Sequence, residues 1–169
     1  MKTAMKHTLK IPAAEYFKFI TSDEFDRWAV EKIHLASRTE IEKSVTPDRL
    51  FKKVKMVSNP VSDTTRMWIK KDRVECIETF DANLRTGTFD WDFVPNVYAD
   101  KIRLSAKGRV TDAGPEQCIR EMTIDFTVKI LIIGGQIEKK ASARMEDAFL
   151  KINRFVEEFY RDNYKKDQA

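Results

Sequence analysis

The last long segment of the chain, from Gly134 to about Tyr164, most strongly limits what this sequence can fold into. After the Gly134-Gly135 pair no Gly or Pro interrupts it. Its apolar residues recur at steps of three and four, as on one face of an α-helix: Ile137, Ala141, Met145, Ala148, Ile152, Phe155, Val156 and Phe159. About 28 residues at ~1.5 Å each form a helix of roughly 40 Å. An apolar stripe of that length needs an equally long surface to cover it.

Segments that alternate between apolar and polar residues supply such a surface. Phe89, Trp91 and Phe93 alternate with polar residues in the clearest example. Further strand-like segments occupy residues 2–10, 38–45, 49–57, 74–80, 101–110 and 121–130. Such alternation is typical of an antiparallel sheet with one apolar and one solvated face. We therefore expect an α+β fold in which a curved sheet of about seven strands wraps around the long C-terminal helix.

Two short helices are expected after the first strand. Pro12 suits the first turn of a helix over residues 12–20. Thr21 and Glu24 form a capping-box pattern that predicts the start of a second helix. Residues 58–63 are typical of a loop. Residues 64–71 show no decisive period, so a short strand, a helical turn and a flap all remain open there.

The length and the apolar runs give expectations about organisation and location. A chain of 169 residues is most simply one domain, which we place at residues 1–164, followed by a loose tail at 165–169. The longest apolar run contains Lys129 and is far shorter than the ~20 residues that span a bilayer. No apolar segment follows Met1-Lys2. We expect a cytoplasmic protein with no membrane span.

The charges and the cysteines favour no metal, cofactor or nucleic acid. The net charge of +4 is scattered in Lys doublets, which is typical of a solvated surface. Cys76 and Cys118 match no metal or redox spacing, so we expect two reduced thiols. The histidines, His7 and His34, have no nucleophile or carboxylate at a telling spacing. We expect no cofactor, no metal and no nucleic acid, and a monomer or weak dimer.

The joint between the last strand and the long helix carries a family resemblance. Residues 128–138 read VKILIIGGQIE, an apolar run followed by two glycines and a polar residue before Ile-Glu. With the order of elements, this resembles the START-like (SRPBCC, helix-grip) superfamily, and within it an uncharacterised bacterial branch. The superfamily includes the major birch pollen allergen, START lipid-transfer domains, aromatic polyketide cyclases and Hsp90 activators. Residues 58–71 depart from that branch, so the resemblance does not place the mouth of a pocket.

The resemblance implies an elongated apolar cavity between the sheet and the C-terminal helix, for a lipid, sterol or polyketide. Apolar residues on the inward phase of the strands and the helix would line it: Val54, Met56, Phe89, Trp91, Phe93, Leu104, Met122, Ile124, Phe126, Met145, Phe149, Ile152 and Phe155. The alternative is that these side chains simply fill a core. Periodicity does not separate a filled core from a lined cavity.

Two charged residues fall on the same inward phase. Glu78 is in phase with Cys76 and Phe80, and Arg120 with Met122. A buried charge requires a partner, so each would be paired inside the protein or would bind a ligand. The alternative is a position at a strand end, near solvent.

Three functions remain open on this reading. The first is binding or transfer of a hydrophobic small molecule or lipid in the cavity. The second is a polyketide cyclase or dehydratase activity in the same cavity, with Glu78 as the candidate acid or base. The third is an Hsp90-activator-like interaction module with a packed interior. No esterase, zinc-protease, phosphate-loop or dinucleotide motif is present, which makes the enzyme the weaker reading.

Overall fold

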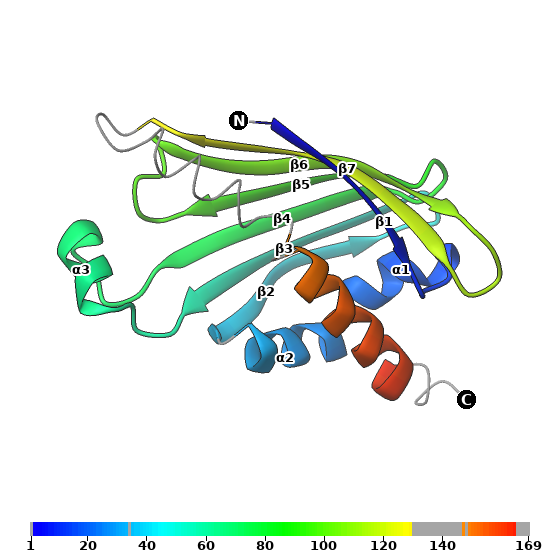
Figure 1. Ribbon diagram of the computed structural model, residues 1–169, viewed down its shortest axis with the longest axis horizontal. Coiled ribbons are helices and arrows are strands. Elements are labelled where there is room, and N and C mark those ends of the chain that lie inside the picture. Colours follow the sequence, from blue (N-terminus) through cyan, green and yellow to red (C-terminus); the bar gives the residue numbers. More distant parts are fainter. Residues whose placement is uncertain (1, 34, 130–146, 148, 165–169) are drawn as a thin grey trace.

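The protein is built around one antiparallel sheet of seven strands, in the order β1-β7-β6-β5-β4-β3-β2 (Figure 1). The computed structural model describes residues 2–33, 35–129, 147 and 149–164. The strands are β1 (Lys2–Leu9), β2 (Leu35–Val45), β3 (Arg49–Ser58), β4 (Glu75–Asn83), β5 (Thr88–Pro95), β6 (Ile102–Asp112) and β7 (Cys118–Val128). Strands β2 to β7 form a continuous meander, and β1 pairs with β7 at the far edge.

Helices cover one face of this curved sheet. α1 (Ala13–Ile20) and α2 (Asp23–Lys32) lie on the same side as the C-terminal helix, drawn in orange and red in Figure 1. We use that name for residues 147 and 149–164, whose last turn, Tyr160–Tyr164, is a π-helix. This is the predicted α+β helix-grip arrangement, which is confirmed. The first half of the predicted long helix, the glycine joint and the tail at 165–169 lie outside the described residues.

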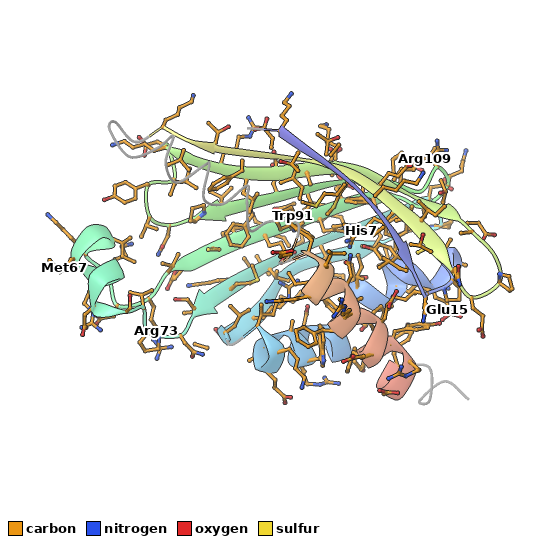
Figure 2. All side chains as sticks on the ribbon, viewed as in Figure 1. His7, Glu15, Met67, Arg73, Trp91 and Arg109 are labelled. Carbon is orange, nitrogen blue, oxygen red and sulfur yellow. The ribbon has the colours of Figure 1, made fainter. Side chains whose placement is uncertain are left out.

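The segment left open by its sequence forms a third helix, α3 (Asp63–Ile69). Figure 1 shows α3 at the end of the molecule remote from the other helices. Its Met67 is 80% exposed and is labelled in Figure 2. None of the described helices combines the length and apolar character needed to cross a membrane.

The start of α2 differs from the predicted capping box. Ser22, not Thr21, is the N-cap residue, and its hydroxyl accepts a hydrogen bond from the backbone N–H of Phe25 at 3.1 Å. The Thr21 hydroxyl instead donates to the carbonyl of Phe17 at 2.6 Å and closes the end of α1. α1 and α2 follow each other so closely that one residue ends the first helix and the next begins the second.

Strand β2 also departs from a simple alternation. Ile41 and Val45 are 52% and 60% exposed, so their side of the strand is not buried. The pairing of β2 with β3 shifts register between Leu35 and Ser37 and again between Glu40 and Glu42. Such irregularities change which side chains face inward along an edge strand.

Aromatic rings fill the core where α1, α2 and the C-terminal helix meet. Phe19 is fully buried, with ring centroids 5.5 Å from Phe25, 5.8 Å from Phe159 and 5.2 Å from Tyr160. Trp28 stacks on Phe159 at 5.1 Å. Edge-to-face and offset-stacked rings at these separations add to the energy of burial. This end of the interior is therefore solidly packed.

Gly108 in β6 lets the ring of Phe89 lie directly on the sheet. A Cβ at this position would stand 2.4 Å from Phe89 Cζ and 2.6 Å from the carbonyl oxygen of Glu121. The second contact is with backbone of the paired strand, which cannot rotate away. Gly108 is thus required by the close approach of Phe89.

We expect Gly108→Ala to destabilise the protein by roughly 1–3 kcal/mol, because the new methyl group overpacks the interior. The measurement is the free energy of unfolding in urea. Ser105→Ala, on the same strand, is the control and should change little. A Gly108→Ala variant as stable as the wild type would show that Phe89 does not lie against this strand.

Both cysteines are free and buried. Cys76 is 8% exposed and Cys118 is fully buried. Burial raises the pKa of each thiol to about 11. A raised thiol pKa leaves only about one thiol in a thousand as the reactive thiolate at pH 8.

We therefore expect native protein at pH 8 to react very slowly with iodoacetamide, and protein unfolded in guanidinium to react at both thiols within minutes. Mass spectrometry of time points measures the number of adducts. Native labelling should accelerate as the pH rises towards 11. Rapid native labelling at pH 8 would contradict the burial of these thiols.

Candidate functional site

A cavity of about 160 Å³ lies between the sheet, the first two helices and the C-terminal helix. Its walls are mainly aromatic and aliphatic, with a few charged groups among them. The lining residues are Tyr16, Ile20, Thr21, Phe25, Arg38, Lys52, Val54, Glu78, Phe80, Phe89, Trp91, Ala106, Arg120, Met122, Phe149, Ile152 and Val156. Figure 2 labels Trp91, which lies between the sheet and the C-terminal helix.

The cavity brings together part of the set expected from sequence. Strands β3, β4, β5 and β7 and the C-terminal helix contribute Val54, Glu78, Phe89, Trp91, Met122, Phe149 and Ile152 to the lining. Ile152 is 38% exposed, so it stands at the edge of the cavity. These residues come from segments far apart in the chain, and those on the strands occupy positions that face inward.

Other expected residues are not among the described residues that line the cavity. Phe93, Leu104 and Phe126 face one another across β5, β6 and β7, in a row one inward position beyond Trp91 and Ala106. Of the remaining members, Met56 accepts a hydrogen bond from Arg38 through its sulfur, and Ile124 is buried in the core. Phe155 is 44% exposed, and Met145 lies outside the described residues.

A buried cation on β3 was not among the site residues expected from the sequence. Lys52 is 3% exposed, and its Nζ donates to Asp26 Oδ2 at 2.5 Å and to the carbonyl of Thr21 at 2.8 Å. Asp26, on α2, also accepts from Arg38 Nε at 2.7 Å. Lys52 shares the inward phase of Val54, but its place in a Lys doublet suggested a solvated side chain. The in-phase position was the signal that could have found it.

Arg38 joins this cation to the predicted Glu78. Its Nη1 donates to Glu78 Oε2 and to the sulfur of Met56, while Trp91 Nε1 donates to the other Glu78 oxygen at 2.7 Å. Desolvation lowers the pKa of Arg38, but attraction to Glu78 and the hydrogen bonds that Arg38 donates to Asp26 and Glu78 outweigh it, so the pKa is raised. Glu78 therefore faces inward and is paired inside the protein, one of the two alternatives drawn from its phase.

Arg120 enters the cavity from β7, four strands away from Lys52 in the sheet order. It is 9% exposed. Its Nη1 donates to the hydroxyl of Tyr16 at 3.1 Å, and its Nη2 donates to Asn153 Oδ1 at 2.7 Å. Tyr16 is on α1 and Asn153 is on the C-terminal helix, so Arg120 connects three elements. The inward position expected for Arg120 is the one observed.

This arrangement gives little support to acid–base chemistry. Both oxygens of Glu78 accept hydrogen bonds, from Arg38 and Trp91. Asp90 is exposed and pairs with Lys107 at 2.9 Å. The described residues contain no group of three or more His, Cys, Asp or Glu that could hold a metal ion. His34 lies outside the described residues.

Comparison with known proteins identifies a family and a fold. A family model described as "Protein of unknown function (DUF2505)" matches residues 4–159, so the chain belongs to that family. A search of the curated proteins found no match. The fold carries the predicted START-like resemblance, which is confirmed by solved structures.

Three of these structures illustrate the likeness. A START superfamily protein from Mycobacterium smegmatis is 13% identical, with a TM-score of 0.58 over 92% of this chain and 97% of that one. The Zhui aromatase/cyclase from a Streptomyces species is 10% identical, with a TM-score of 0.61 over 96% of both chains. Ara h 8.0201 is 18% identical, with a TM-score of 0.58 over 92% of this chain and 97% of that one. At such identities the likeness shows the fold alone.

Replacing Asp26 by Asn should destabilise the protein by roughly 3–5 kcal/mol, because Lys52 and Arg38 would lose the carboxylate that neutralises them. Urea unfolding of Asp26→Asn measures the loss. The matched control is Asp81→Asn, since Asp81 binds Arg49 through two hydrogen bonds at 2.8 and 2.6 Å, in an exposed pair. Its loss should be much smaller. Equal losses would mean that the network around Asp26 is as well solvated as the surface pair.

Proposed function

We propose that this START-like protein binds a small hydrophobic molecule, or the hydrophobic part of a larger one, in the cavity between its sheet and its C-terminal helix. The observation that carries the proposal is the cavity of about 160 Å³ with mainly aromatic and aliphatic walls. Pockets of this kind, with few polar groups that orient a ligand, are typical of small-molecule sites.

The volume sets the scale of the ligand. An apolar cavity of roughly 150 Å³ is known to take up benzene. The space here accommodates a group of about one ring, or a short alkyl segment. Burying it removes apolar surface from water at about 25 cal/mol per Å², before the costs of association. Phe80, Phe89, Trp91 and Phe149 give the walls flat surfaces on which a ring can stack.

Binding is better supported than the other two functions. A cyclase-like enzyme would use the same cavity, but its candidate acid, Glu78, is held by Arg38 and Trp91. A protein-interaction module would be expected to have a filled interior, whereas Ala106 and Met122 border open space. The enzymatic alternative remains a second candidate because an aromatase/cyclase has the same fold.

The test uses propylbenzene as a neutral probe of about the right size. Saturation-transfer NMR should show contact between propylbenzene and the wild type. Met122→Trp should abolish the contact while the protein stays folded, because the larger ring occupies the cavity at a buried site. Thr123→Trp, on the outer face of the same strand, is the control and should bind as the wild type does.

Two results would count against the proposal. One is propylbenzene contact that is unchanged in Met122→Trp, which would place binding elsewhere. The other is a wild type that binds no propylbenzene and whose native mass stays that of the bare chain after incubation with a mixed lipid extract.

A further inference from the structure

Arg120 is a buried cation whose described partners are all neutral. The hydroxyl of Tyr16 and the amide oxygen of Asn153 accept its hydrogen bonds, and the described residues place no carboxylate in ion-pair contact with it. Moving a charge out of water is costly unless an opposite charge or several hydrogen bonds compensate for it. Arg120 is only 9% exposed, so solvent provides little of that compensation.

The same cluster contains two buried N–H groups without an acceptor among the described residues. They are Arg120 Nε and Asn153 Nδ2. The orientation of the Asn153 amide follows from its neighbour, because Arg120 can only donate and must face the amide oxygen. If the amide were rotated by half a turn, its NH2 group would face the N–H of Arg120, and two donors would be in contact. Arg120 lines the cavity, so a ligand bound there lies within reach of this guanidinium.

At the other charged end of the cavity, each buried cation has a carboxylate partner within the protein. There Lys52 and Arg38 are in direct contact with the carboxylates of Asp26 and Glu78. The half-exposed Glu40 adds a third carboxylate, 3.8 Å from Lys52. Arg120 has no such counterpart among the described residues. The cavity thus has one end where every described cation is paired with a carboxylate and another that lacks a negative charge and a hydrogen-bond acceptor. His7, labelled in Figure 2, lies opposite Arg120 in the register of β1 with β7, at the end of the cavity that contains Arg120.

We propose that the natural ligand is a small carboxylic acid whose carboxylate binds Arg120 and whose apolar part occupies the cavity. The proposal rests on the proposed function and names the chemical class of its ligand. A carboxylate consists only of acceptors, and its two oxygens match the parallel N–H groups of a guanidinium. It supplies the missing charge and an acceptor for Nε in one group. Phe89, Trp91 and Met122 then enclose the hydrocarbon part.

The experiment compares two probes that differ in one end. Isothermal titration calorimetry measures the Kd of 3-phenylpropanoate and of 3-phenylpropan-1-ol for the wild-type protein. The acid should bind about 10- to 100-fold more tightly, as expected for hydrogen bonds to a charged group. This comparison requires no variant, so it does not depend on how a substituted chain folds.

Variants then assign the preference to Arg120. Arg120→Met should bind the acid and the alcohol about equally, while Arg120→Lys should retain part of the preference, since it keeps the charge but loses the planar fork. Arg49→Met removes an exposed arginine of the surface pair with Asp81 and should keep the full preference. Circular dichroism of each variant confirms that it is folded before titration.

The outcomes separate this inference from the proposed function. Equal binding of acid and alcohol by the wild type, or propylbenzene binding without binding of the acid, overturns the inference and leaves the hydrophobic site standing. An acid preference that survives in folded Arg120→Met assigns the anion to another cation and overturns the role of Arg120. Failure of propylbenzene and both phenylpropyl probes counts against the proposed function itself.

Discussion

The free-energy cost of burying charged side chains on the inner face of the sheet determines which helices and strands must be in contact in this protein. Lys52 and Arg38 have side chains 3% and 8% exposed, so each must meet a carboxylate in the folded state. The carboxylates come from Asp26 on α2 and Glu78 on β4, while the cations come from β3 and β2. One continuous network therefore ties a helix to three strands. It fixes where α2 crosses the sheet, and with it one wall of the cavity.

The distribution of large and small side chains explains why a cavity remains beyond that network. Across the middle of the sheet, Trp91 stands opposite Ala106, and Phe89 stands between Ala82 and Gly108. Each large ring thus has a small neighbour on the next strand. The packed aromatic cluster around Phe19 is formed by α1, α2 and the C-terminal helix, which lie at the same end of the sheet (Figure 1). The rings on the sheet have room because their neighbours are small.

Periodicity predicted the strands and the helix-grip order because a period of two or 3.6 records which side of an element is buried. It did not predict the network, since Arg38 and Lys52 are charged residues on inward positions and the rule for such patterns assigns charge to the surface. It also placed Phe93, Leu104 and Phe126 in the lining. Their phase is inward, but phase does not tell how far along the sheet a cavity extends; only the cross-strand register does.

Whether a buried polar group has its charge and hydrogen bonds satisfied within the protein distinguishes structural groups from ligand-binding ones. A buried ionic group whose oxygens and N–H groups are all satisfied, such as Glu78, is complete without a ligand and has little left to offer to a reaction. A buried donor that lacks an acceptor, such as Arg120 Nε, remains a cost to the empty protein. A ligand that supplies the acceptor removes that cost, so it gains affinity from the protein's own unsatisfied group. At 10–18% identity, the likeness to solved structures shows the fold and leaves the polar groups of the cavity to be read from this chain itself. The chemistry of the ligand is therefore to be sought in the buried polar groups that the packing leaves without partners, and Arg120 provides a charged group of this kind among the described residues.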